Sequence, residues 1–265
     1  MLITYLNKPE LKDAFLAEIG KHEKLDAIIR GSYGQMNGHF TGCAIGCSLY
    51  SLSVLRGKTP QEAATNISDH RRYEAELGWP TWLAYYEDSI FEHLPAELSK
   101  TWPRRIAEAV PVGISIPDTV LAKLQAWWLI HERFGVVNAT DDAELKAIIM
   151  TSGDLFRQIG DGIDAPEAAK EQAAWDARTA WWDAWAARTA RAGDARTARA
   201  ARAARTAWAA RAGDARTAWA ARTVWTAWAA RTACLNADSL ASVATRDAFY
   251  PALSEYLLSL LRDLR

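Results

Sequence analysis

Hydrophobic residues in the first part of the chain recur at intervals of three and four positions, as they do on the buried face of an α-helix. After Pro9, for example, Leu11, Phe15 and Ile19 fall on one helical face. The alternation of a β-strand is plausible only from Leu2 to Leu6, and one short strand cannot form a sheet. The pattern therefore predicts an all-α fold.

Proline, glycine and capping residues mark the expected helix boundaries. Thr59 and Glu62 have the spacing of a capping box, with Pro60 at the first helical position. A longer buried helix is predicted from Leu121 to about Phe134. Further helix starts are predicted at four prolines: Pro80, Pro95, Pro103 and Pro117. Helix ends are predicted at Gly78 and Gly135.

A different pattern fills residues 165–233, which we call the arm. From Trp175 to Arg231, Trp or Arg stands at nearly every third position, and Ala or Thr fills most of the others. The segments 191–197 and 211–217 have the same sequence, so the arm contains a repeat of about twenty residues. Its Ala and Arg content, with no proline between Pro166 and Pro251, predicts helix.

The bulky residues of the arm do not share one face. A step of three residues falls about 60° short of a full helical turn, so the Trp and Arg positions wind around the helix. Residues eleven apart nearly eclipse, which places Trp208 over Trp219 and Arg205 over Arg216. We expect these side chains to pack between helices, in one chain or in a homo-oligomer. Whether the arm is continuous or breaks at Gly193 and Gly213 stays open.

Pattern and charge together divide the chain into an acidic helical domain (1–164), the basic repeat arm (165–233) and a C-terminal helix (234–265). The arm holds twelve basic and six acidic residues, whereas the formal net charge of the whole chain is −1. Opposite charges favour docking of the arm on its own body or on a second copy. This charge excess is a weak footprint for nucleic acid, which we do not expect as a partner.

Half of the residues are hydrophobic, enough for a substantial core, but no uncharged run is long enough to span a bilayer. We expect a cytoplasmic protein without a membrane partner. Its 3 cysteines cannot form a disulfide framework.

The densest chemical signal is the segment 38–47, in which three glycines surround a histidine and two thiols. Cys43 and Cys47 are interpreted first as small buried residues where two helices approach closely over Gly42 and Gly46. Alternatively, Cys43 lies in the first turn of a helix, whose N-H groups lower a thiol pKa and produce a nucleophile.

Two histidines extend these alternatives. A cysteine nucleophile needs a base, for which His39 or His70 would have to come near in space. His39, Cys43 and Cys47 are also four residues apart, so a continuous helix would align them as three metal ligands, with a fourth from elsewhere. The glycine between His39 and Cys43 argues against such a helix.

A second polar cluster falls on the helix predicted between Pro80 and His93, where Glu87, Asp88 and Glu92 lie outside the apolar stripe. Asp88 and Glu92 are four apart and repel each other unless a cation lies between them. These carboxylates are either solvated surface, partners of an arginine, or acid, base or hard-metal ligands. The candidate arginines are Arg30, Arg71 and Arg72. Tyr73 and Glu74, beside His70, form another polar group nearby in the sequence.

Four segments carry a resemblance: 42–47 (GCAIGC), Tyr73-Glu74, 87–92 (EDSIFE) and Trp102-Pro103. Together they resemble an uncharacterised family of small proteins from bacteriophages and bacterial metagenomes, whose members often end in an Ala-rich arm with aromatic and Arg residues. The resemblance covers roughly residues 20–130 and implies no activity. It raises only the expectation of a role directed at a host or at a signal molecule.

The sequence favours a non-enzymatic binding protein, oligomeric, that holds a nucleotide-like anion or a protein partner such as a host protein between acidic body and basic arm. The expected ligand-binding residues come from both parts: Arg30, Tyr73, Glu87, Asp88, Arg205, Trp208, Arg216 and Trp219. No cofactor or resident metal is expected.

Two alternatives stay open. One is a purely structural, self-associating protein. The other is a cysteine-dependent hydrolase or transferase, whose catalytic candidates are Cys43, Cys47, His39, His70 and Glu87.

Overall fold

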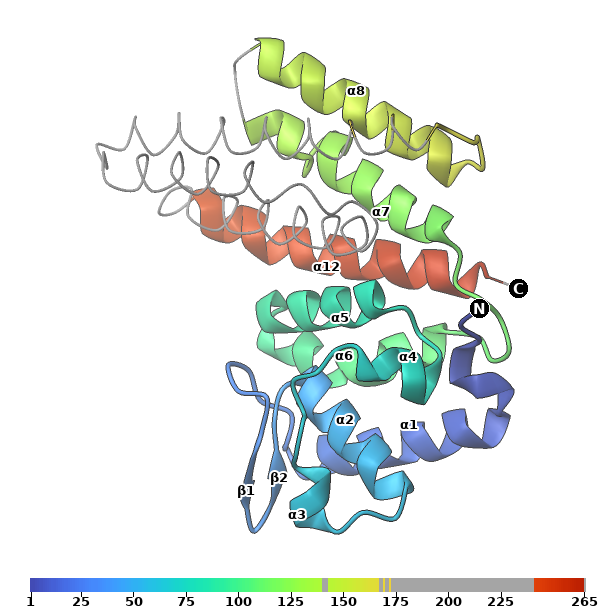
Figure 1. The fold of residues 1–265 in the computed structure, drawn as a ribbon. Helices are drawn as coiled ribbons and strands as arrows, with labels where there is room; N and C mark the ends of the chain where they lie inside the picture. The colour runs from blue at the N-terminus through green and yellow to red at the C-terminus, as the bar shows by residue number, and fades with distance from the viewer. Residues whose placement is uncertain (140–142, 167–168, 170–171, 173–240, 265) are drawn as a thin grey trace, which may run out of the picture. The chain divides into compact units, whose positions relative to one another are not determined.

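The fold was analysed in a computed structural model, which describes residues 1–139, 143–166, 169, 172 and 241–264 (Figure 1). All but four residues of the arm lie outside these ranges, and so does its expected repeat. The described part is all-α, as predicted, with two short strands. It divides into two compact units, one of Met1–Pro117 with Asp247–Arg265 and one of Asp118–Arg246. The boundaries at 164 and 233 stay predictions, and the N-terminal segment of the first unit ends at Pro117.

The first unit begins with a 3-10 turn, η1 (Thr4–Asn7), and then contains two short strands and most of the helices: α1 (Pro9–Lys24), β1 (Gln35–Asn37), β2 (His39–Thr41), α2 (Ala44–Leu55), α3 (Pro60–Ala63), α4 (Arg72–Leu77), α5 (Thr81–His93) and α6 (Ala96–Ala109). From Asp247 onward, α12 (Ala241–Arg262) also belongs to this unit. Its Tyr250 stacks on His93 of α5, and its Glu255 pairs with Arg105 of α6. The C-terminal helix thus contacts α5 and α6 within the first unit.

The segment Leu2–Leu6, for which a strand was predicted, is not one. Tyr5 and Leu6 have positive φ angles of 53° and 54°, and Tyr5 is fully buried in η1. The ring of Tyr5 contacts Trp79 edge-on at 5.6 Å between centroids. Packing against this tryptophan, rather than pairing with another strand, determines the conformation of the segment.

Most of the predicted helix boundaries are found. Thr59 and Glu62 form the capping box, and Gly78 ends α4 in the left-handed conformation at φ 65°. Pro103, however, lies inside α6 and does not start a helix. Trp102 and Ile106 on either side are fully buried, so the packing of this face maintains the helix through the proline.

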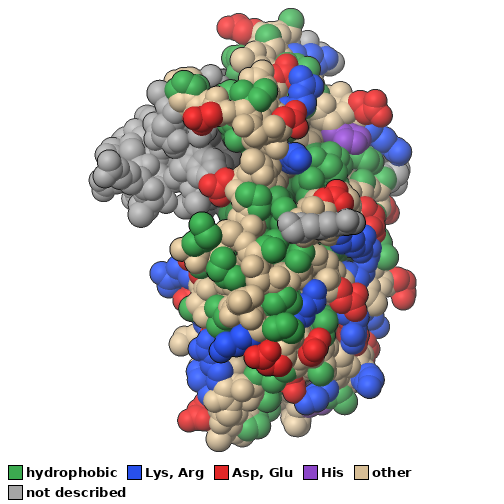
Figure 2. Space-filling model, turned by 90° about the vertical axis from the view of Figure 1, so that its right-hand side faces the viewer, with side chains coloured by type: hydrophobic (Ala, Val, Ile, Leu, Met, Phe, Trp, Pro, Cys, Tyr) green, Lys and Arg blue, Asp and Glu red, His purple; other side chains and the backbone are tan. Residues whose placement is uncertain are grey.

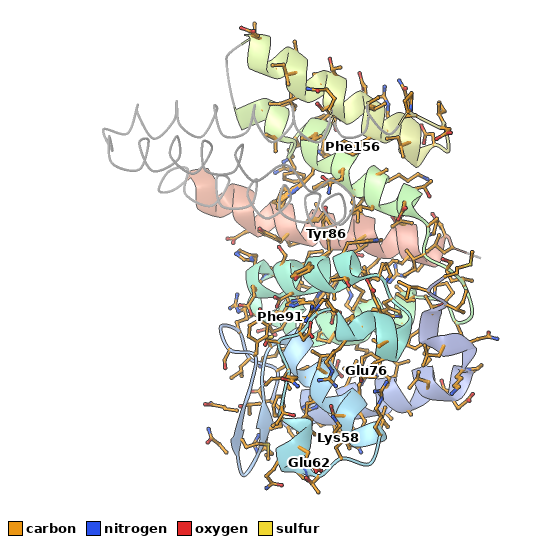
Figure 3. All side chains as sticks on the ribbon, viewed as in Figure 1. Lys58, Glu62, Glu76, Tyr86, Phe91 and Phe156 are labelled. Atoms are coloured by element: carbon orange, nitrogen blue, oxygen red, sulfur yellow. The ribbon has the colours of Figure 1, made fainter. Side chains whose placement is uncertain are left out.

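Side chains of α2, α4, α5 and α6 form the interior of the first unit, where Phe91 of α5 is fully buried (Figure 3). On the face that Figure 2 displays, acidic and basic side chains are interspersed among hydrophobic ones. None of the helices within the described ranges has an apolar stretch of bilayer-spanning length.

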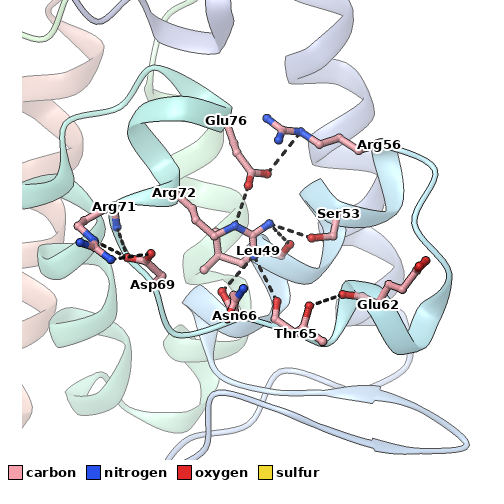
Figure 4. A network of polar contacts seen from close by, with 10 residues as sticks. All are labelled: Leu49, Ser53, Arg56, Glu62, Thr65, Asn66, Asp69, Arg71, Arg72 and Glu76. Atoms are coloured by element: carbon pink, nitrogen blue, oxygen red, sulfur yellow. Dashed lines mark hydrogen bonds and ion pairs between the residues drawn. The ribbon is translucent and has the colours of Figure 1, made fainter.

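A polar network around Arg72 fastens the segment before α4 to α2 (Figure 4). Its guanidinium donates to Glu76 at 2.7 Å, to the Ser53 hydroxyl at 2.8 Å and to the Asn66 carbonyl at 3.0 Å. The fork geometry of Arg lets one side chain bind three segments of chain. This network therefore holds the loop that carries His70.

The second unit contains α7 (Asp118–Ile130), the 3-10 turn η2 (Val136–Ala139) and α8 (Ala143–Gly160). Gly153 lies against Ile130 and Gly160 against Lys123, so α7 and α8 run antiparallel. The predicted helix end near Phe134 falls four residues later than the end of α7, and Gly135 comes just before η2.

Candidate functional site

The site begins at the N-terminus of α2, where Cys43 is the N-cap residue. Its sulfur accepts a hydrogen bond from the Gly46 N-H at 3.5 Å, and only 2% of its surface is exposed. The chain enters α2 through a bridge between Gly42 and Ile28, and the Cys43 N-H donates to the Ser32 carbonyl at 2.8 Å. These bonds set the position of the Cys43 thiol.

Gly42 and Gly46 permit a close approach, as predicted, but the partner is a loop and not a second helix. A Cβ atom on Gly46 would lie 1.5 Å from the Tyr33 carbonyl oxygen, and one on Gly42 would lie 2.3 Å from it. Any larger residue would therefore displace this loop. The two glycines bring Tyr33 over the start of α2.

Cys47 has a structural role. It is 1% exposed, and its thiol donates to the Gly42 carbonyl at 3.3 Å. Burial raises the pKa of this thiol to about 12. This side chain matches the interpretation of the cysteines as small buried residues.

Cys43 instead faces the acidic side of α5. Its sulfur and one carboxylate oxygen each of Asp88 and Glu92 lie within 4.8 Å of one another. Asp88 and Glu92 are one helical turn apart, which places both on the face of α5 that meets the start of α2. We call these three residues the Cys43 cluster.

Asp88 has an ordered partner outside the cluster. His70 Nε2 lies 3.2 Å from Asp88 Oδ2, and its Nδ1 lies 3.0 Å from the Ser68 carbonyl oxygen. The imidazole stacks on Tyr85 at 4.3 Å between centroids. His70 is thereby held in one orientation and bonds to Asp88, not to the Cys43 thiol.

Glu92 is positioned by the loop before β1. The Gly31 N-H donates to its carboxylate at 3.1 Å, and the neighbouring Arg30 guanidinium donates to the Leu94 carbonyl oxygen at 3.1 Å. Arg71 and Arg72 pair instead with Asp69 and Glu76. The three arginines considered as partners for the carboxylates of α5 thus bind other groups.

The pKa of the Cys43 thiol is raised, which counts against the alternative in which the helix N-terminus lowers it to produce a nucleophile. Burial raises the pKa of Cys43, and the negative charge of Asp88 raises it further, which outweighs the hydrogen bond from Gly46. Burial and Asp88 also raise the pKa of Tyr33 to about 12. The part of these shifts that comes from the negative charges of Asp88 and Glu92 disfavours a further anion and favours a cation.

Behind the cluster lies a second polar layer. Ser48 Oγ, Tyr73 Oη and Glu87 Oε2 are buried, and no hydrogen bond of good geometry reaches them from the described residues. Burial raises the pKa of Glu87 to about 8, although the nearby Tyr73 hydroxyl opposes this shift. Glu87 and Tyr73, both predicted ligand residues, are therefore interior groups.

The remaining predicted residues are not in this site. His39 is exposed on β2 and does not join Cys43 and Cys47 as a metal ligand. Arg205, Trp208, Arg216 and Trp219 lie outside the described residues.

Sequence reasoning did not select Tyr33 and Tyr85 as site residues. Neither belongs to a motif, and their positions depend on the loop over α2 and on the stacking of His70. The four-residue spacing from Asp88 indicated Glu92 as a site residue, but nothing in the sequence indicated that it would lie near the Cys43 sulfur.

A comparison of the chain with known protein families, curated proteins and solved structures found no match. The resemblance to a bacteriophage and metagenomic family therefore stays a hypothesis.

Proposed function

We propose that the first unit is a non-enzymatic binding module for a cation, and that the Cys43 cluster is its binding site. The observation that carries this proposal is the convergence of the Cys43 sulfur with Asp88 and Glu92 oxygens within 4.8 Å. Two carboxylates one turn apart repel each other, and a bound cation relieves that repulsion.

Burial strengthens the case for a cation. Cys43 is 2% exposed, and the side chain of Asp88 is 20% exposed. Charges of one sign that are partly removed from water interact more strongly than charges on an open surface. A cation bound here gains from that field, whereas a nucleotide-like anion would be repelled. An anion site between body and arm stays a separate prediction, because it depends on arm residues.

Thermal melting of the full chain, first freed of metal by a chelator, tests the proposal. We expect one or more of Zn²⁺, Mn²⁺, Mg²⁺, Ca²⁺ and tetramethylammonium to raise the melting temperature. At about 100 times its Kd, a ligand adds about 2.7 kcal/mol to the free energy of unfolding. Asp88→Asn and Glu92→Gln should each remove most of the stabilisation.

Glu97→Gln is the matched control, because Glu97 is an exposed acid on α6 outside the cluster. This variant should respond to cations like the unaltered chain. If no cation raises the melting temperature, or if the stabilisation survives in Asp88→Asn, the Cys43 cluster is not a cation site.

A further inference from the structure

We infer that the cation is a thiophilic divalent metal ion of the zinc class, bound by the Cys43 thiolate and by one oxygen each of Asp88 and Glu92. This inference rests on the proposed cation-binding function and names the ligand of the same site. Sulfur is a soft ligand that Zn²⁺ and Co²⁺ bind well, whereas Mg²⁺ and Ca²⁺ prefer oxygen.

The distances between the three ligand atoms suit such an ion once these atoms move slightly closer together. Bonds of about 2.0 Å to oxygen and about 2.3 Å to sulfur place the ligands of a tetrahedral zinc ion about 3.3 to 3.5 Å apart. The three atoms lie within 4.8 Å of one another before any ion is considered. Asp88 and Glu92 are only partly buried, so their side-chain torsions are the degrees of freedom that would close this difference.

The orientation of the thiol is an observation independent of the acidic pair. Cys43 is 98% removed from solvent and its sulfur faces two carboxylates. Within the described part of the chain, its S-H donates no hydrogen bond, unlike that of Cys47. A metal ion supplies the missing partner. Its binding breaks the S-H bond, releases the proton to solvent and forms a metal-sulfur bond, with no change of oxidation state.

Each of the three ligands also has an outer partner. Asp88 bonds to His70, Glu92 accepts from the Gly31 N-H, and the Cys43 sulfur accepts from Gly46. Such outer hydrogen bonds orient metal ligands, and their loss commonly lowers metal affinity about 10- to 100-fold. Three protein ligands leave a fourth tetrahedral position for water or a small ligand.

Titration of the metal-free full chain with Co²⁺ tests this assignment, because a cobalt-thiolate bond gives a charge-transfer band in the near ultraviolet. We expect the band to saturate at one equivalent and to disappear when Zn²⁺, but not Mg²⁺, is added. Cys43→Ser should abolish it. Cys47→Ser and Cys234→Ser, which retain Cys43, should show it unchanged.

Two further variants keep the test decisive if Cys43→Ser folds poorly. Asp88→Asn should lower the Co²⁺ affinity at least tenfold, and His70→Gln should lower it about 10- to 100-fold while the band itself remains. Far-ultraviolet circular dichroism of each variant monitors its fold.

The outcomes separate the two proposals. A band that persists in Cys43→Ser overturns the zinc-class assignment. So does stabilisation by Mg²⁺ or Ca²⁺ that requires Asp88 while Co²⁺ gives no band, although the cation-binding function then stands. If no cation stabilises the chain, both proposals fail.

Discussion

Residues of the same type, a few positions apart, have different roles in this chain because they face different surroundings. Cys43 and Cys47 are four residues apart, but one thiol faces carboxylates and the other donates to a backbone carbonyl. Glu87 and Asp88 are adjacent, but Glu87 points into the interior and Asp88 toward His70. Direction and desolvation, rather than residue type, determine what each group can do.

A first prediction concerns Gly46, whose lack of a side chain lets the Tyr33 carbonyl approach. A Cβ atom there would lie 1.5 Å from a backbone oxygen that cannot rotate away. We expect Gly46→Ala to lower the free energy of unfolding by about 3 kcal/mol or more and to abolish cation binding. Denaturant unfolding and the cation titration measure the two effects.

Gly20→Ala is the control, because Gly20 also lies in a helix, and a Cβ atom there would meet the Arg104 side chain at 2.5 Å. That guanidinium can move, and alanine favours helix by about 1 kcal/mol over glycine, so the change in stability should stay within about 1 kcal/mol. Equal losses in both variants would contradict the role assigned to Gly46.

At the scale of elements, local signals predicted the helices that begin at a cap or a proline, such as α1 at Pro9 and α3 at Pro60. The hairpin of β1 and β2 was missed, although Asn37, the last residue of β1, and Gly38, which follows it, form a common turn dipeptide. Its strands have three residues each, too few for alternation to be recognised. Short elements depend on the packing around them.

The attachment of α4 to α2 gives a prediction at this scale. Arg72 is 16% exposed, and its ion pair with Glu76 is accompanied by bonds to α2 and to the preceding loop. Arg72→Ala leaves the mostly buried Glu76 carboxylate with Arg56 alone, whose Nε lies 3.7 Å away, so we expect a loss of about 3 kcal/mol, the lower end for a broken buried pair. Denaturant unfolding measures it.

Arg71→Ala provides the comparison, since the Arg71 side chain is 79% exposed and pairs only with Asp69 nearby. Water screens an exposed pair of this kind, so the loss of stability in Arg71→Ala should be much smaller than in Arg72→Ala. A small loss in Arg72→Ala, similar to that in Arg71→Ala, would show that the network does not fasten α4.

At the scale of the molecule, burial of His22 couples the stability of the first unit to pH. His22 is 6% exposed and lies 3.1 Å from the Ser51 hydroxyl, and its ring meets the stacked rings of Phe40 and Tyr50 edge-on. Burial lowers its pKa to about 4, and the nearby Lys21 and His39 act in the same direction, while Glu18 opposes them. The folded unit therefore holds a neutral imidazole at neutral pH.

The direction of the pH effect follows from proton uptake. Between about pH 6.5 and 4 the unfolded chain protonates His22 and the folded unit does not, so the contribution of His22 is complete above about pH 6.5 and declines as the pH falls. A shift of this size corresponds to at most about 3 kcal/mol. Hydrogen exchange of peptides from α1 and α2 measures it within the first unit.

His22→Gln should lose less stability than the unaltered chain between pH 7 and about pH 4.5. His39→Gln is the control, because His39 is exposed and is only a minor cause of the lowered pKa of His22, so this variant should keep most of the acid sensitivity. If His22→Gln is as acid-sensitive as the unaltered chain, other groups cause the effect.

The sequence by itself determined the all-α class, many helix starts and the pairing of Asp88 with Glu92 on one helical face. These features depend on backbone preferences and on residues three or four positions apart, which a linear pattern records. Only the tertiary structure brought Cys43 to α5, placed His70 behind Asp88 and joined the end of the chain to its beginning. Those contacts join residues far apart in the chain and depend on packing and desolvation, so the rise in the pKa of Cys43 could not be foreseen from its position at a helix N-terminus.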